Sequence, residues 1–98
     1  MARARPLESS VEAALVRYAK ERGIYTRKFA SPARRGVPDR IFIKHGVVVF
    51  MEVKRPGEVP TPLQLHEQKQ IADHGGIAVW CDSVAAGKNL LDIYLNIL

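Results

Sequence analysis

Apolar positions follow two different periods along the first half of the chain. Over residues 7–22 they recur every three to four positions, at Val11, Ala14, Leu15, Tyr18 and Ala19. This is the period of a helix with one buried face, and the glycine at position 23 is a natural stop. Residues 24–29, a mixture of apolar and basic residues, predict a strand, and runs rich in valine, isoleucine and phenylalanine predict two more over 39–44 and 47–53. The last two strands are separated only by a His-Gly pair, which predicts a tight turn.

The second half predicts a helix, a strand and a final helix. Thr61, Pro62 and Gln64 suit the N-cap, N1 and N3 positions of a capping box, so a helix should begin there and end near Gly75. A strand over 77–82 follows, and Ser83 can cap a last helix that reaches residue 98. Residues 47–51 are apolar at every position, which indicates a central strand covered on both faces.

The order helix, three strands, helix, strand, helix predicts an α/β fold, in which helices flank a small mixed sheet. A chain of 98 residues is long enough for one domain, which we expect over residues 7–98, after a flexible basic arm over 1–6. The last helix, residues 89–98, is apolar enough to cover the sheet of its own subunit or to contribute to a dimer interface.

The net charge of +5 favours a polyanionic partner, with nucleic acid the leading candidate. The one cysteine, Cys81, lies in an apolar run and is interpreted as a small core residue. The sequence shows neither a secretory signal nor an apolar run of membrane-spanning length. We therefore expect a cytoplasmic protein that does not bind membranes.

The chemistry is concentrated in Asp39, Glu52 and Lys54. Glu52 and Lys54 are two apart in a predicted strand and share one face, and the hairpin returns this strand so that Asp39 lies near Glu52. Two neighbouring carboxylates repel each other unless a cation lies between them. Oxygen ligands with no cysteine or histidine pair indicate Mg²⁺ or Mn²⁺. The alternative for Glu52 is an ion pair with Lys54 or an arginine at a sheet edge.

Basic residues surround this predicted site and are expected to contact phosphates on either side of a cut. They are Arg27, Lys28, Arg34, Arg35, Arg40 and Arg55. Lys20 and Arg22 are interpreted instead as the solvated end of a helix. Trp80 is interpreted as a core residue, with base stacking as its alternative.

Three segments together resemble the virus-type replication-repair nuclease domain, VRR-NUC, of the PD-(D/E)XK superfamily. They are Gly36-Val37-Pro38-Asp39-Arg40, Glu52-Val53-Lys54 and Thr61-Pro62-Leu63-Gln64. The resemblance spans residues 8–83 and implies a restriction-endonuclease-like αβββαβα core. It also implies an Mg²⁺-dependent, structure-selective DNA endonuclease similar to Holliday junction resolvases. A homodimer would fit, because opposed cuts across a junction need two active sites. The resemblance also fits a viral or prophage origin.

Carried over by residue, the resemblance implies that Asp39 and Glu52 are metal ligands and that the Val53 carbonyl is a third. Lys54 corresponds to the catalytic lysine. Gln64 corresponds to the family's glutamine, and a purely structural function in the capping box with Thr61 is its alternative.

The family also uses a glutamate on the first helix, for which the chain offers Glu8 and Glu12. Glu12 is favoured because the residues after it have a spacing similar to that of archaeal junction resolvases. Its alternative is a capping box with Ser9. Two rival functions stay open: a non-catalytic DNA-binding module on a nuclease fold, and a nuclease without junction preference.

Overall fold

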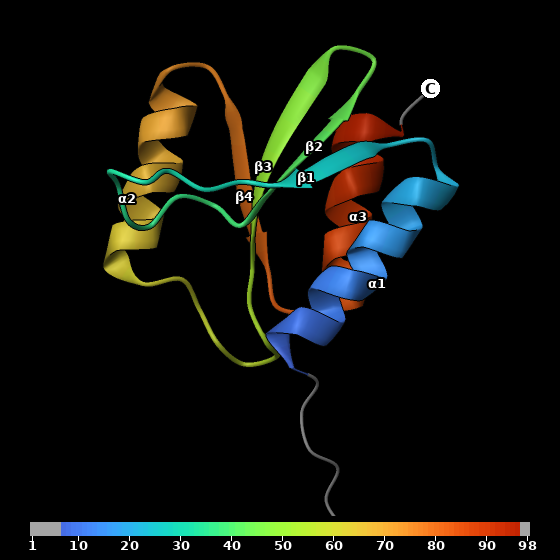
Figure 1. The fold of residues 1–98 in the computed structure, drawn as a ribbon, viewed down its shortest axis with the longest axis horizontal. Coiled ribbons are helices and arrows are strands. Elements are labelled where there is room, and N and C mark those ends of the chain that lie inside the picture. Colours follow the sequence, from blue (N-terminus) through green and yellow to red (C-terminus); the bar gives the residue numbers. More distant parts are fainter. Residues whose placement is uncertain (1–6, 97–98) are drawn as a thin grey trace, which may run out of the picture.

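The computed structural model describes residues 7–96, so the predicted arm over 1–6 and the last two residues lie outside it. Every predicted helix and strand is present, and the α/β class is confirmed (Figure 1). The elements follow one another as α1 (Glu8–Glu21), β1 (Tyr25–Lys28), β2 (Arg40–Lys44), β3 (Val47–Val53), α2 (Pro62–Asp73), β4 (Ile77–Cys81) and α3 (Val84–Leu95).

The four strands form one mixed sheet in the order β1-β2-β3-β4. The first three pair antiparallel, and the crossover through α2 brings β4 parallel to β3. His45 and Gly46 form the β2–β3 turn with φ values of 51° and 78°, the combination that suits the twist of a two-residue hairpin. In this register Arg40 lies opposite Met51, which places Asp39, the residue before β2, next to Glu52.

Helices α1 and α3 cover one face of the sheet, and α2 lies on the other side (Figure 1). The hydrophobic core lies beneath α1 and α3 and includes Leu15, Phe42, Met51 and Leu91, each fully buried. Cys81 also belongs to this core, as predicted, and burial raises the pKa of its thiol to about 11. Helix α3 therefore covers the sheet of its own subunit, through Leu91 and Leu95.

The opposite face of the sheet is only partly covered, so the prediction that β3 is buried on both faces is wrong. Val48 is 38% exposed. Helix α2 packs against the edge strand β4 and buries only the polar side chains of Glu67 and Gln68. Tyr25, Ile43 and Val48 are partners across β1, β2 and β3, which makes them an apolar row on this face.

Candidate active site

Three carboxylates meet where α1 begins, β2 begins and β3 ends. One carboxylate oxygen from each of Glu8, Asp39 and Glu52 lies within 4.8 Å of the other two. Within residues 7–96 this is the one group of acidic, histidine or cysteine side chains with the spacing of a metal site. The hairpin therefore brings Asp39 and Glu52 together as the sequence predicts, and the helix contributes Glu8.

Asp39 is fixed from both sides by backbone contacts. Its Oδ2 accepts a hydrogen bond from the Val53 N–H at 3.0 Å, and its carbonyl accepts one from the Phe29 N–H at 2.8 Å. The preceding Pro38 is fully buried, and its ring restricts the backbone at the entry to β2. The side chain of Asp39 is thus held against the end of β3. The ligand function of the Val53 carbonyl stays a prediction.

Glu52 is 2% exposed and only partly neutralised. Its Oε2 lies 3.6 Å from Lys54 Nζ and accepts a hydrogen bond from Gln64 Nε2 at 3.2 Å. Its Oε1 is buried and has no hydrogen-bond partner. Burial, and then the neighbouring Asp39, raise the pKa of Glu52 to about 8, against the smaller opposing effect of Lys54. A buried carboxylate in this state is stabilised by any cation that reaches it.

Gln64 makes both of the contacts that the sequence left as alternatives. Its Oε1 accepts from the Thr61 N–H at 2.9 Å, and its own N–H donates to Thr61 Oγ1 at 3.2 Å, which completes the capping box. Its side-chain amide donates to Glu52 at the same time. The start of α2 is therefore fastened to the carboxylate cluster by one side chain.

On the first helix, the geometry favours Glu8 over Glu12. Glu8 belongs to the carboxylate cluster, and burial followed by repulsion from Asp39 raises its pKa. Glu12 lies one turn further along α1, where its Oε2 is 2.8 Å from Arg40 and 3.2 Å from Lys28. The predicted capping box of Glu12 with Ser9 is absent, because the N-cap residue is Leu7 and makes no side-chain cap.

The basic residues that were predicted to bind DNA differ in their exposure and in their contacts. Arg40 is largely buried between Glu12 and Thr26, so it supports the fold of β2. Lys28 also contacts Glu12, but its side chain is 77% exposed. The guanidinium of Arg27 lies 4.5 Å from the centre of the Tyr25 ring and is exposed. Arg55 lies 3.6 Å from Glu58, at the end of the sheet where β3 leads into α2.

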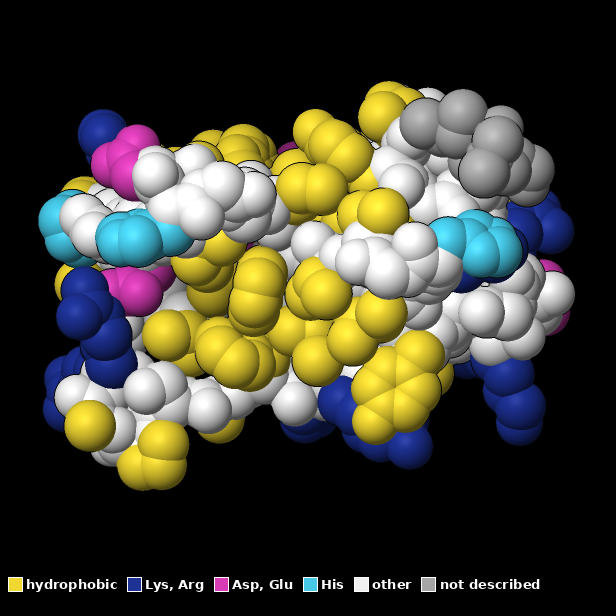
Figure 2. Space-filling model, turned by 90° about the horizontal axis from the view of Figure 1, so that it is seen from above, with side chains coloured by type: hydrophobic (Ala, Val, Ile, Leu, Met, Phe, Trp, Pro, Cys, Tyr) yellow, Lys and Arg dark blue, Asp and Glu magenta, His cyan; other side chains and the backbone are white. Residues whose placement is uncertain are grey.

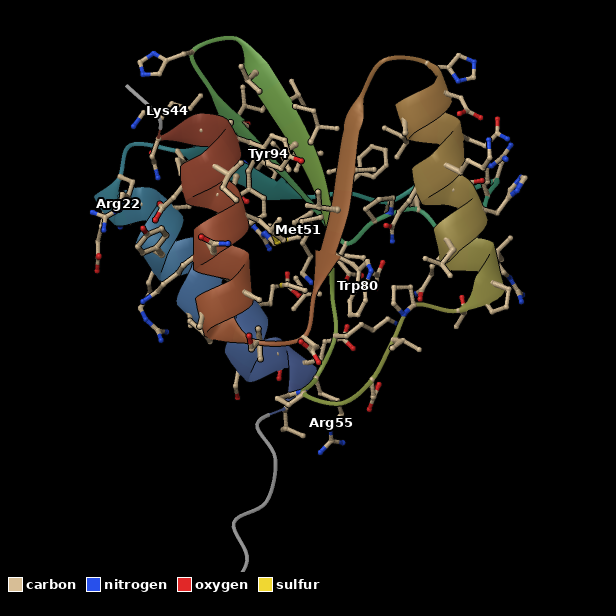
Figure 3. All side chains as sticks on the ribbon, turned by 180° about the vertical axis from the view of Figure 1, so that it is seen from behind. Arg22, Lys44, Met51, Arg55, Trp80 and Tyr94 are labelled. Atoms are coloured by element: carbon tan, nitrogen blue, oxygen red, sulfur yellow. The ribbon has the colours of Figure 1, made fainter. Side chains whose placement is uncertain are left out.

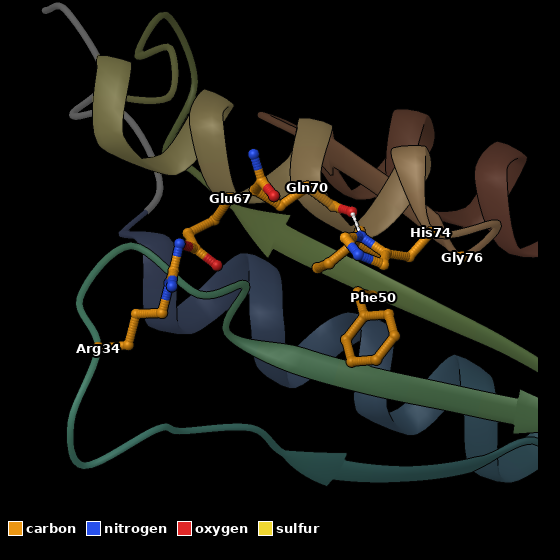
Figure 4. Close-up of a pocket in the computed structure, with 7 residues that line it drawn as sticks. Arg34, Phe50, Glu67, Gln70, His74 and Gly76 are labelled. Carbon is orange, nitrogen blue, oxygen red and sulfur yellow. Dashed lines mark hydrogen bonds and ion pairs between the residues drawn. The ribbon is translucent and has the colours of Figure 1, made fainter.

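Arg34 reaches across from the loop before β2 to pair with the buried Glu67 of α2 (Figure 4). This pair borders a hollow of about 520 Å³ whose lining also includes Phe50 and His74. Gly36, in the same loop, approaches Leu63 so closely that a Cβ atom would lie 2.8 Å from it. The loop is thus packed on α2, and Arg34 is engaged there. Arg35 is exposed, and no carboxylate of the described residues pairs with it.

Trp80 is half-buried and lies opposite Glu52 in the β3–β4 register. Figure 3 shows it on β4, above the loop that carries Arg55. It therefore lies beside the candidate site, although its predicted place was the core. Arg17 and Lys20 of α1 are exposed cations that lie far from the site's motifs along the chain, so no sequence signal connects them with it.

These residues fit a divalent cation. Three carboxylates supply hard oxygen ligands, one buried oxygen lacks a partner, and the raised pKa values of Glu8 and Glu52 have carboxylate repulsion among their causes. Lys54 is 9% exposed and lies beside the cluster, where its ammonium group can contact a phosphate or a water molecule.

Within residues 7–96, no helix has the length and apolar character that crossing a membrane requires.

Proteins with similar sequences and structures carry nuclease names. The chain is 43% identical over 77 residues to "Putative nuclease p44" of Acyrthosiphon pisum secondary endosymbiont phage 1, covering 78% of this chain and 83% of that protein. No family profile matches the chain.

Two solved structures share the fold. One, a "VRR_NUC domain", superposes with a TM-score of 0.81 at 27% identity and covers 89% of this chain and 96% of its own. A second, a "VRR_NUC domain protein", has a TM-score of 0.77 at 17% identity over 97% of this chain and 93% of its own, and so supports the fold alone. The order of elements, the carboxylate cluster and the phage relative agree, and the chain belongs to the VRR-NUC family of nucleases.

Proposed function

We propose that this protein is an Mg²⁺-dependent DNA endonuclease that prefers branched DNA, with four-way junctions as the leading substrate. The observation that carries the proposal is the buried Glu52, whose Oε1 has no partner, beside Glu8, Asp39 and Lys54. Mn²⁺ has the same preference for oxygen ligands and should substitute for Mg²⁺. The preference for branched DNA rests on the resemblance to junction resolvases.

In the proposed reaction, the oxygen of a water molecule attacks the phosphorus in line and forms a new P–O bond. The opposite P–O bond, to a sugar oxygen, breaks, and a proton released by the water ends on that leaving sugar hydroxyl. Glu8, Asp39 and Glu52 would hold the cation. When bound, Mg²⁺ supplies Lewis acidity toward a phosphoryl oxygen and lowers the pKa of a coordinated water. Lys54 donates a hydrogen bond to the attacking water or to the scissile phosphate. Gln64 and the Val53 N–H hold Glu52 and Asp39 in position.

The proposal includes a homodimer, because residues 7–96 of each chain hold one carboxylate cluster and paired cuts need two. Figure 2 shows hydrophobic side chains gathered between α2 and the β2–β3 hairpin. The row formed by Tyr25, Ile43 and Val48 lies on the uncovered sheet face, and Tyr25 and Val48 are 51% and 38% exposed. A second copy seated on this row would bury it. Mass measurement in solution tests this, and Val48→Glu should give a monomer.

The test of function is a cleavage assay on labelled four-way junction, flap and linear duplex, with Mg²⁺ or EDTA. We expect Mg²⁺-dependent cutting, fastest on the junction, and its loss in Asp39→Ala and Lys54→Ala while DNA binding remains. Equal cutting of all three substrates would leave a nuclease without junction preference. Binding without cutting of any substrate would favour the non-catalytic DNA-binding module.

A further inference from the structure

A continuous groove runs from the carboxylate cluster along the side of α1 that faces β1. It consists of three adjoining hollows of about 520, 480 and 480 Å³. The first includes Glu8 in its lining and shares Ser9, Glu12 and Lys28 with the second. The second shares Val16 and Arg40 with the third. The groove therefore begins at the proposed metal site and leads away from it.

The wall of this groove on α1 is one helical stripe. Ser9, Glu12, Val16 and Lys20 are three or four residues apart, the spacing that places side chains above one another on a helix, and Arg17 flanks them. From Ser9 to Lys20 the helix rises about 17 Å, at 1.5 Å per residue. Each DNA strand advances about 3.4 Å per nucleotide, so this length corresponds to roughly five base pairs.

The groove has an excess of positive charge. Arg17 and Lys20 are exposed, and no ion pair engages either of them among residues 7–96. Lys28 lies on the opposite wall with a side chain that is 77% exposed. The one carboxylate in the middle hollow, Glu12, pairs with Arg40 at 2.8 Å and with Lys28 at 3.2 Å, so it leaves the charges of Arg17 and Lys20 unpaired.

We infer that this groove holds the phosphodiester backbone of the DNA arm that extends from the scissile phosphate, with Arg17, Lys20 and Lys28 as its phosphate contacts. The inference rests on the proposed function, because it takes the carboxylate cluster as the place of cutting. The alternative route over the outer sheet face is less suited to a polyanion. There Arg34 is engaged by Glu67, and the exposed Val48 and the half-buried Ile43 are apolar.

The salt dependence of DNA binding tests the inference. Affinity for a four-way junction is measured across a salt series with Ca²⁺ in place of Mg²⁺. Each phosphate contact contributes about 0.9 to the slope of log affinity against log salt concentration. Arg17→Ala should therefore lower the slope by about 0.9, and Arg17→Ala with Lys20→Ala by about 1.8. The matched control is Lys69→Ala on α2, whose ammonium pairs with Asp73, and it should keep the wild-type slope.

A second measurement maps the path directly. Ser9→Cys and Lys20→Cys each carry a tethered iron–EDTA group, and Cys81 should stay unlabelled because it is 2% exposed. Strand scission from the two positions should fall on the same arm, displaced by about five nucleotides. Scission at coinciding positions, or none from Lys20→Cys, would overturn the inference.

The outcomes separate this inference from the proposed function. If the wild type cuts DNA with Mg²⁺ but the double variant keeps the wild-type slope, the groove inference fails and the nuclease proposal stands. If the wild type cuts nothing but the variants lose slope as expected, the groove binds DNA and the proposed catalysis fails.

Discussion

The side-chain amide of Gln64 donates a hydrogen bond to Glu52 Oε2 at 3.2 Å while its carbonyl oxygen caps α2 through the Thr61 N–H. One side chain thus connects the start of a helix to a buried carboxylate of the proposed metal site. The two contacts have separate consequences, because Thr61 takes part in the cap and does not contact Glu52.

Gln64→Ala and Thr61→Ala should separate these two contributions. Each removes half of the capping box and should lower the free energy of unfolding by about 1 kcal/mol. Only Gln64→Ala also frees Glu52, so it should reduce the rate of DNA cleavage at saturating Mg²⁺ about tenfold or more, whereas Thr61→Ala should cut at nearly the wild-type rate. Equal cutting by the two variants would contradict a function for Gln64 beyond the cap.

The raised pKa of Glu52 predicts how stability depends on pH without metal. Its pKa is about 8 in the folded state and near 4.5 when unperturbed, so the folded protein binds more protons between these values. The free energy of unfolding should therefore fall as the pH rises from 5 to 8. Glu52→Gln cannot lose this proton and should become more stable relative to wild type over the same range.

Urea unfolding in EDTA at pH 5, 6, 7 and 8 measures this difference. Glu58→Gln, which removes an exposed carboxylate, is the control for a general change in net charge. A constant difference in stability between Glu52→Gln and wild type at all four values would show that Glu52 ionises normally.

Glu8 and Glu12 should respond oppositely to replacement. Glu8→Gln removes a proposed ligand from the cluster, so cleavage should be lost with little change in stability. Glu12→Gln leaves the guanidinium of Arg40, whose side chain is 11% exposed, without its ionic partner. Breaking such a buried pair costs about 3 kcal/mol. Thermal unfolding and cleavage should be measured on both variants. Loss of cutting in Glu12→Gln alone, in a protein that is still folded, would contradict the assignment of Glu8 as the helix ligand.

Gly36 should prove necessary for the loop that leads into Asp39. Its φ of 83° favours glycine, and a Cβ atom would lie 2.8 Å from Leu63 Cγ and 3.0 Å from the Leu63 carbonyl oxygen. Gly36→Ala should lower the free energy of unfolding by about 2 kcal/mol or more, because strain at positive φ adds to this clash. Gly23→Ala is the matched control.

Gly23 has a similar φ of 71° but no atom near the added Cβ, so the variant should lose only about 1 kcal/mol. Denaturant midpoints compare the two variants. Equal losses would mean that the contact between the loop and α2 contributes nothing.

The sequence predicts the elements well because their signals are local. Thr61, Pro62 and Gln64 fix the start of α2, and His45-Gly46 fixes the hairpin that brings Asp39 to Glu52. The choice between Glu8 and Glu12 is not local, since both lie on α1 and only the packing of its first turn against the sheet distinguishes them. The same limit applies to Arg34 and Arg40, whose acidic partners are 33 and 28 residues away in the chain.

The apolar run over residues 47–51 also could not show that one face of β3 is uncovered. Residues 47–51 are apolar throughout, but coverage depends on where α2 packs, and α2 lies against β4. The apolar row of Tyr25, Ile43 and Val48, whose two outer members are exposed, follows from this placement.

The position of a bound cation in crystals of the protein grown with Mn²⁺ tests the proposed metal site without relying on activity. We expect an anomalous difference peak enclosed by the carboxylates of Glu8, Asp39 and Glu52, and its absence from crystals of Glu8→Gln. A peak at Glu12, or no peak in fully folded wild-type protein at saturating Mn²⁺, would contradict the claim that these three carboxylates form the metal site.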